Sequence, residues 1–319
     1  MTTRFALTFA ASCAAIVFLA APSRAQLYNL TKEQLIELTS QNKFDRFPDG
    51  RPKVPDALIE RARGMSAEEV WAGLNQFGGA GGGGGRGGGP AYRNQYEDGF
   101  HVLHPNLKMV GRAFTVQFMP ARPDVDTYVN AHAKAGGLGD RLYNQSAIDM
   151  LQPGDVLVVD LFGKKVGGTV VGDNLFYYAM RATHRGGLVV DGSIRDLNGI
   201  SEIDMPAYFR DVDPTPIDNV MLTGINIPIR IGGVTVMPGD LVVGDREGVY
   251  FIPPQFVNEV LDRADEIRIH DEWTKKKFDE GKYKSSEIYS SPKDPNLQKE
   301  YAAYLKRRLE EIRKQRSQR

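Results

Sequence analysis

The sequence is poor in the side chains that most often carry redox chemistry and soft-metal binding. It contains one cysteine, Cys13, in an apolar N-terminal stretch, and five histidines in 319 residues. If that stretch is removed, the remaining chain has no thiol, which excludes disulfides, thiolate metal sites and a cysteine nucleophile. The 40 basic residues balance the 40 acidic ones. No net charge therefore recruits nucleic acid or an anionic membrane, and any partner must be argued locally.

The first 25 residues have the features of a secretory signal. Arg4 precedes the apolar run FALTFAASCAAIVFLAA, and Ser23 and Ala25 are small residues in front of a cleavage point. The run is about 17 residues long, shorter than the ~20 of a transmembrane helix, and no stop-transfer charge cluster follows it. We expect cleavage between Ala25 and Gln26, a periplasmic or secreted protein, and no stable membrane anchor.

Residues 26–109 are expected to form a helical N-terminal extension. Two capping boxes, TKEQ at 31–34 and SAEE at 66–69, mark helix starts. Within this extension, the glycine-rich segment 77–90 is predicted to be disordered. A phosphate-binding loop is the alternative, but no GK[ST] follows the glycines and no apolar strand precedes them.

From Val110 the pattern becomes α/β. VGRAFTVQFMP reads as a strand, VLVVDLF as a buried strand after a PGD turn, and GLVVDGS as the next strand after a helix at about 173–184. Further β segments follow, one of them after a second PGD turn. Residues 261–319 form a charged helical tail that ends in KRRLEEIRKQRSQR. The charge of that end suits a solvated helix, with contact to an anionic surface as the alternative.

The segment from Gly172 to Asp196 places a helix N-terminus and a strand C-terminus at one edge of the predicted sheet, where α/β proteins bind ligands. Amides of the first helical turn suit an anion, and Arg195 offers a two-pronged donor for a carboxylate. Asp196 supplies a hard oxygen ligand, which favours Mg²⁺ or Mn²⁺ over Zn²⁺. Spacing alone leaves open a surface ion pair between Arg195 and Asp196.

The motifs GDNL, GLVVDGSIRDL and INIPIRIGGVTVMPGDLVVGDREGVYFIP, with the preceding PGDVLVVD, resemble the core of the RraA-like family in order and spacing. The resemblance covers 110–260 and implies an RraA-like α/β/α sandwich core with β-rich segments. That family includes regulators of ribonuclease activity and class II aldolases for 4-hydroxy-4-methyl-2-oxoglutarate. The resemblance also implies that the protein is a homotrimer or homohexamer with active sites between subunits.

The resemblance also implies roles for individual residues. Arg195 matches the arginine that holds pyruvate or its enolate, and Asp196 matches the metal-ligating aspartate. Asp173 matches a carboxylate that acts on metal-bound water. Gly172, Asn174 and Leu175 belong to the substrate-binding helix start. The residue that best matches a glutamate supplied by the neighbouring subunit is Glu272, with Glu266 and Asp271 as competitors.

The resemblance implies a metal-dependent aldolase that cleaves 4-hydroxy-2-oxo acids to release pyruvate, with oxaloacetate decarboxylation as a side activity, and these residues suit that chemistry. A Schiff-base mechanism at Lys164 or Lys165 is disfavoured, because two adjacent lysines in a GKKVGG loop are expected to be solvated. His101 and His104 lie in a loop-like stretch without a third ligand, so structural roles are expected for them. A non-catalytic regulatory binding protein and another carbon–oxygen lyase acting through the same enolate remain open.

Overall fold

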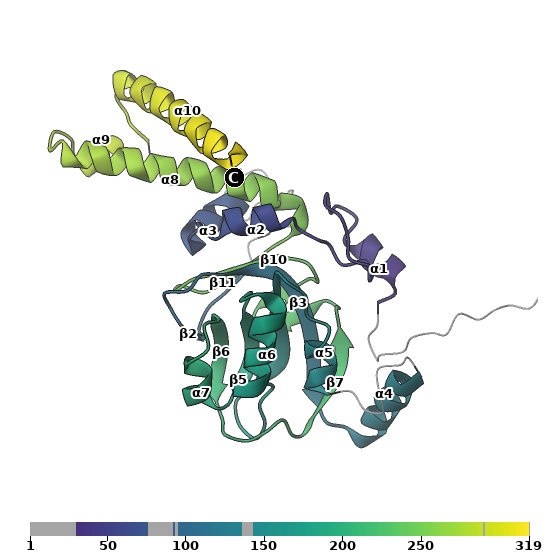
Figure 1. Cartoon of the computed structure of the whole chain (residues 1–319). Helices are drawn as coiled ribbons and strands as arrows, with labels where there is room; N and C mark the ends of the chain where they lie inside the picture. Colours follow the sequence, from purple (N-terminus) through teal and green to yellow (C-terminus); the bar gives the residue numbers. More distant parts are fainter. Residues whose placement is uncertain (1–29, 76–91, 93–94, 136–142, 290, 319) are drawn as a thin grey trace, which may run out of the picture.

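The computed structural model describes residues 30–75, 92, 95–135, 143–289 and 291–318 (Figure 1). The predicted signal at 1–25 and the glycine-rich segment at 77–90 lie outside the described residues. The strands are β1 (Tyr96–Glu97), β2 (His101–Leu103), β3 (Met109–Pro120), β4 (Asp155–Lys164), β5 (Leu188–Ile194), β6 (Ala207–Val212), β7 (Val220–Ile225), β8 (Ile229–Ile231), β9 (Val234–Val236), β10 (Leu241–Gly244) and β11 (Val249–Ile252). The helices are α1 (Lys32–Leu38), α2 (Asp56–Ala62), α3 (Ala67–Asn75), α4 (Pro123–Ala135), α5 (Asn144–Ile148), α6 (Asp173–Thr183), α7 (Leu197–Ser201), the 3₁₀ turn η1 (Pro254–Phe256), α8 (Val257–Asp279), α9 (Ser285–Ile288) and α10 (Pro295–Ser317).

Within the described residues, the main sheet has nine strands in the order β1-β11-β10-β3-β4-β5-β6-β2, with β7 also paired to β3. The four central strands, β3 to β6, run parallel to one another, and the flanking strands are antiparallel. Helix α6 connects β4 to β5, and α7 lies between β5 and β6. The carboxyl end of β5 and the start of α6 therefore meet at one edge of the sheet, as predicted.

The sheet is curled, and its two faces bury different apolar clusters. One part of the outer face packs under α5 and α6, with Phe114, Leu157 and Phe176 among the buried residues. Another part, on β10 and β11, packs under α2, α3 and α8. The inner face is closed by the β8–β9 hairpin. The α/β core with helical extensions at both ends is confirmed. Because the sheet curls, α5 and α6 cover one part of its outer face, and α2, α3 and α8 cover another part (Figure 1).

The predicted helix starts are confirmed at both capping boxes. The Thr31 hydroxyl accepts the Gln34 amide while the Gln34 side chain accepts the Thr31 amide. Ser66 and Glu69 exchange the same pair of hydrogen bonds. One expectation was wrong in detail. His101 belongs to β2, which pairs with β6, and not to a loop. The sequence did not indicate this strand, because a segment of three residues is too short to show an alternating pattern. The division of the chain at Val260 stays a prediction; in the structure this residue lies in α8, whose first turns pack on the core.

The N-terminal extension is anchored in the core by a buried ion pair. Arg51 donates to Oδ1 and Oδ2 of Asp155 at 2.7 and 3.1 Å, and both side chains are almost completely buried. The guanidinium also lies 4.2 Å from the ring centroid of Phe47. Asp155 belongs to the first PGD turn, and its second oxygen accepts the amide of Gln152. The extension is therefore part of the folded body and not an appendage.

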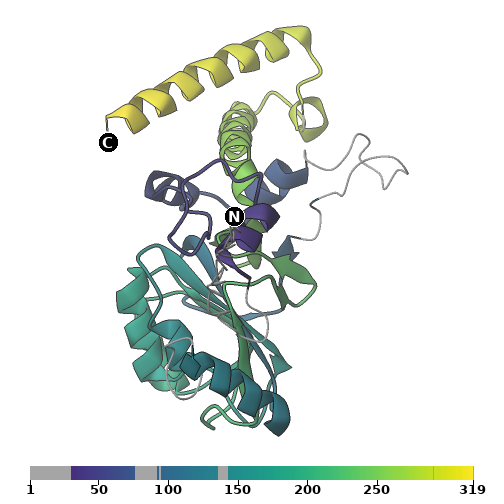
Figure 2. The same ribbon diagram turned by 90° about the vertical axis from the view of Figure 1, so that its right-hand side faces the viewer.

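The chain ends in a helical arm formed by α8, α9 and α10, which projects from the body beyond α2 and α3 (Figures 1 and 2). Its apolar core is a small separate cluster of Trp273, Ile288 and Leu297. Charged contacts hold α10 against α8, including Arg316 with Asp265 at 2.6 and 2.8 Å. None of the helices in the described residues combines the length and the apolarity of a membrane span.

Candidate active site

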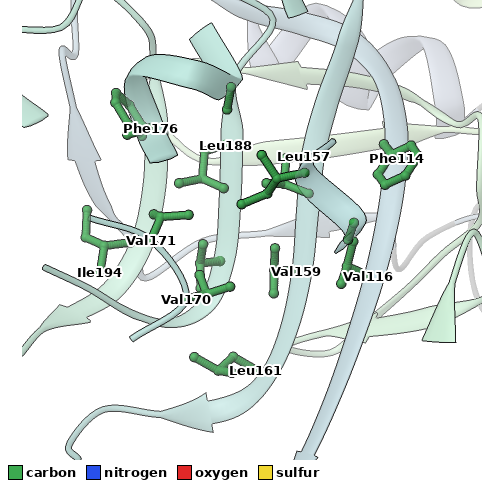
Figure 3. Packing of buried hydrophobic residues seen from close by; sticks show 14 of the residues in the cluster. Phe114, Val116, Leu157, Val159, Leu161, Val170, Val171, Phe176, Leu188 and Ile194 are labelled. Atoms are coloured by element: carbon green, nitrogen blue, oxygen red, sulfur yellow. The ribbon is translucent and has the colours of Figure 1, made fainter. Parts of the chain in front are cut away.

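Buried apolar residues next to the predicted site residues anchor both halves of the site. Val171 precedes Gly172, and Ile194 precedes Arg195, and Figure 3 shows these two apolar side chains in the same cluster as Phe176. The amide of Arg195 donates to the carbonyl of Val171 at 3.1 Å. This backbone bond ties the end of β5 to the start of α6. Gly172, Asp173, Arg195 and Asp196 are therefore brought together by the core, as the sequence predicted.

Asp196 has an unusual backbone conformation. It caps α7 with φ 59° and ψ 42°, in the left-handed region, which aspartate tolerates better than most residues and which often marks functional positions. Its side chain turns back over the start of α6, where a Cβ on Gly172 would collide with Oδ2 of Asp196. The same Cβ would lie 3.0 Å from Nε of Arg195. Gly172 therefore leaves the space that the two side chains occupy.

Asp173 and Asn174 begin α6 beside this pair. Oδ1 of Asp173 accepts the amide of Asn174 at 2.7 Å, so this amide, expected to be available for a ligand, is already engaged. Phe176 is the first residue whose amide reaches the carbonyl of Gly172, at 2.9 Å. A ligand carboxylate at this helix start would compete with the Asp173 side chain for the Asn174 amide, because both are anionic acceptors.

An open hollow of about 520 Å³ lies between the two helix starts, lined by Asp173, Asp196, Leu197, Asn198 and Gly199. Arg195 is outside this lining, and its Nε stands 3.7 Å from Oδ2 of Asp196 with about a third of each side chain exposed. The ion pair is thus loose and accessible, which leaves the guanidinium able to turn to an incoming carboxylate. Leu175 is half-buried on the first turn of α6, and its side chain packs against the core.

Residues 197–199 were not predicted as part of the site. Leu197 has 39% of its surface exposed, and Asn198 adds an exposed amide to the same wall. They occupy the first turn of α7, immediately after Arg195 and Asp196. The sequence offered one signal for these residues. They follow Asp196 directly, and the first turn after a strand end lines the same edge of the sheet as that strand end.

The donor set of the hollow suits a hard divalent cation. Nowhere in the described residues are three His, Cys, Asp or Glu side chains grouped to hold an ion by themselves. Mg²⁺, however, commonly keeps several waters and binds through one or two carboxylates. Asp196 and Asp173 provide two carboxylates at an open hollow, and no sulfur or imidazole is among the residues that line it. The residues present therefore fit a partly hydrated Mg²⁺ or Mn²⁺.

Glu272 lies in α8, within the arm, and Figure 1 shows α8 at the opposite end of the molecule from α7. Its carboxylate accepts the Tyr304 hydroxyl at 2.5 Å, Nζ of Lys276 at 3.0 Å and both Nε and Nη2 of Arg308. The Tyr304 hydrogen bond, with those from Lys276 and Arg308, lowers the pKa of Glu272 to about 2. Its contribution to a neighbouring subunit's site stays a prediction.

The competing candidates have other contacts. Nζ of Lys164 donates to the carbonyl of Val166 at 3.0 Å, and Lys165 is 60% exposed, the solvated environment expected for a lysine that is not a Schiff base. The His104 ring lies 2.9 Å from the carbonyl oxygen of Ile203. His101 stacks on Phe209.

Comparison with known proteins gives the family. The chain is 36% identical over 135 residues to a protein of Halalkalibacterium halodurans named "Putative 4-hydroxy-4-methyl-2-oxoglutarate aldolase", which covers 42% of this chain and 63% of that protein. It is 29% identical over 171 residues to protein DlpA of Legionella pneumophila, covering 53% of this chain and 25% of that one. The chain thus spans less than two thirds of these relatives.

Solved structures share the fold. The RraAS2 protein of Streptomyces coelicolor, described as an unusual member of the RNase ES inhibitor RraA protein family, superposes with a TM-score of 0.55 at 26% identity, covering 70% of this chain and 98% of that one. An uncharacterized protein of Pseudomonas syringae pv. tomato gives 0.56 at 22% identity, covering 75% and 94%. The RraA-like family model (Aldolase/RraA) matches residues 89–251, about half of the 319 residues. The chain belongs to the RraA-like family.

Proposed function

We propose that this chain is a divalent-metal-dependent class II aldolase that cleaves 4-hydroxy-2-oxo acids, such as 4-hydroxy-4-methyl-2-oxoglutarate, and releases pyruvate. The observation that carries the proposal is an open hollow at the carboxyl edge of the parallel strands that two carboxylates, Asp173 and Asp196, line, with Arg195 beside Asp196. The aldolase name of the Halalkalibacterium relative supports the reaction class.

The basic and the acidic residues of the site have different proposed roles. Arg195 is the group that would hold the carboxylate of the 2-oxo acid, because a guanidinium binds a carboxylate through two parallel hydrogen bonds. Asp196 would hold Mg²⁺ or Mn²⁺ directly, and Asp173 would accept hydrogen bonds from the water that such an ion keeps. When bound, such an ion supplies positive charge beside the oxo-acid oxygen, where negative charge develops as the bond breaks.

Cleavage breaks the bond between C3 and C4 of the substrate, and its electron pair moves toward the C2 oxygen. The C4 hydroxyl must lose its proton in the same step to become a carbonyl. Asp173 is the candidate acceptor of that proton, since its carboxylate lines the hollow and is half-exposed. Protonation at C3 then yields pyruvate. Oxaloacetate would be decarboxylated by the same charge stabilisation, as a side activity.

Two variants at the site test the proposal. We expect Asp196→Asn to lose metal-dependent pyruvate release, because an amide keeps the shape of the side chain but not its charge. Arg195→Lys should also fail, since an ammonium cannot reproduce the forked contact. Each loss is expected to be about 10² to 10³ in rate. The assay measures pyruvate released from a panel of 4-hydroxy-2-oxo acids, with and without Mg²⁺.

Arg185 and Asp204 form an exposed ion pair 2.8 Å long, outside the site. Arg185→Lys and Asp204→Asn are therefore matched controls that should keep wild-type rates. Circular dichroism would verify that all four variants fold. If Asp196→Asn and Arg195→Lys release pyruvate like the controls, the site lies elsewhere. Silence of the wild type across the panel would favour a regulatory binding protein, or carbon–oxygen lyase chemistry on other substrates.

We also propose that the protein assembles as a homotrimer or homohexamer and that Glu272 completes a neighbour's site. The test is light scattering combined with activity. A fully active monomer would remove Glu272 from the reaction, because no neighbour would be present to receive it.

A further inference from the structure

The two helix starts at the hollow fit into each other through two glycines. The carboxylate of Asp196, which caps α7, occupies the space that a Cβ on Gly172 of the α6 cap would fill. In the opposite direction, a Cβ on Gly199 of α7 would lie 3.0 Å from both Cβ and Oδ2 of Asp173. Each acidic side chain is thus seated against a glycine of the other helix.

The contact with Gly199 is the one that relates Asp173 to the rest of the site. The hydrogen bond from the Asn174 amide is local to α6, because donor and acceptor are adjacent residues. It fixes the rotamer of Asp173 but not the distance of its carboxylate from α7, which carries Asp196. The close approach of Gly199 sets that distance.

The backbone of α7 does not itself require glycine at this position. The φ of Gly199 lies outside the left-handed region that favours glycine. Alanine is also a better helix former than glycine in a helix such as α7. The close contact with Asp173, and not the conformation of α7, therefore explains why a glycine stands at position 199.

We propose that Gly199 is a positioning residue, which holds the carboxylate of Asp173 at the distance from Asp196 that the hollow requires. This inference rests on the proposed function. An added methyl at 3.0 Å is tighter than ordinary van der Waals contact, so Asp173 must move by a few tenths of an ångström. Displacement of a supporting carboxylate commonly costs about 10- to 100-fold in activity or in metal affinity.

The first test separates positioning from a general effect on folding. We expect Gly199→Ala to lower kcat by about 10- to 100-fold and to leave KM nearly unchanged, because Arg195 is untouched. Its Tm should stay the same or rise, since alanine favours the helix. In the Asp173→Ala background, Gly199→Ala should cause no further loss of kcat, because the group that it positions is already gone.

The second test needs no turnover. Binding of Mn²⁺ alone, measured by water-proton relaxation, should weaken by about 10- to 100-fold in Gly199→Ala, and this loss should also disappear in the Asp173→Ala background. Gly172→Ala is the matched comparison: its loss of Mn²⁺ affinity should disappear in the Asp196→Ala background. Gly64→Ala is the control, because a Cβ there meets its nearest neighbour at an ordinary 3.6 Å.

The outcomes separate the two proposals. A wild type that binds Mn²⁺ but releases no pyruvate would end the aldolase proposal. The Mn²⁺ affinities of Gly199→Ala, with and without Asp173→Ala, would still decide the role of Gly199. Losses that multiply in the Asp173→Ala background, or a Gly199→Ala protein with wild-type kcat and Mn²⁺ affinity, would overturn the positioning role. A wild type with neither activity nor Mn²⁺ binding would overturn both.

Discussion

The buried carboxyl group of Asp240 is expected to make the stability of the fold depend on pH near neutrality. Asp240 belongs to the second PGD turn, and only 1% of its surface is exposed. One oxygen accepts the Met237 amide at 2.9 Å, while Oδ1 has no hydrogen-bond partner among the described residues. Burial raises the pKa of Asp240 to about 7 from its ordinary 3.8, against the opposing hydrogen bond from Met237.

The magnitude follows from the two pKa values. A pKa of about 7 in the folded chain, against 3.8 when unfolded, makes ionisation up to about 4 kcal/mol less favourable in the folded state. The folded chain holds the proton more tightly, so its stabilising effect is complete below about pH 4. It is lost progressively between about pH 4 and about pH 7, and above that pH the penalty is constant. Acidic denaturation by other carboxylates acts in the opposite direction, so only a comparison of variants isolates the term.

The comparison is Asp240→Asn against wild type, with free energies of unfolding measured by urea titration at pH 5, 6, 7 and 8. The amide oxygen of asparagine can still accept the Met237 amide. We expect Asp240→Asn to be the more stable protein by about 1 to 2 kcal/mol at pH 5 and by up to about 4 kcal/mol at pH 8. A difference that does not change between pH 5 and pH 8 would show that Asp240 does not titrate in this range and would refute the reasoning.

Three further outcomes are expected. Arg51→Ala should cost about 3–5 kcal/mol in the free energy of unfolding at pH 7, because it leaves Asp155 buried without its partner; urea titration measures this, and a loss below about 1 kcal/mol would contradict it. Glu272→Gln should make α10 more susceptible to trypsin, since the hydrogen bonds from Tyr304 and Arg308 weaken; an unchanged cleavage rate would show that other contacts hold the arm. N-terminal sequencing of the exported protein should begin at Gln26, and a mature chain in the cytosol that still begins at Met1 would be incompatible with the predicted signal.

The sequence predicted those parts of the fold that have a strong local pattern. The long strand β3, the helix α6 and both capping boxes could be found because apolar spacing and cap residues act within a few positions. The short strands β1 and β2 could not, since two or three residues show no period. They join the sheet only through pairing with β11 and β6, contacts that depend on distant segments.

The candidate site divides in the same way. Arg195, Asp196 and Asp173 were predicted from their places after a strand and at a helix start, and the fold brings them together. Gly199 was not predicted, because glycine has no side chain that indicates a chemical role. Its proposed role depends on its contact with Asp173, which the sequence does not show. The ion pair of Arg51 with Asp155 joins residues 104 positions apart, a separation at which no local pattern operates.

The arm and the body are held together by different forces, and this gives them different responses to the solvent. The body buries three large apolar clusters, whose cohesion added salt does not weaken. The arm buries a few apolar side chains and depends on partly exposed pairs between α8 and α10, such as Glu272 with Arg308, which dissolved ions screen. In native-state hydrogen exchange, α10 would therefore lose protection first as the salt concentration rises, and would do so while the sheet beneath still exchanges slowly.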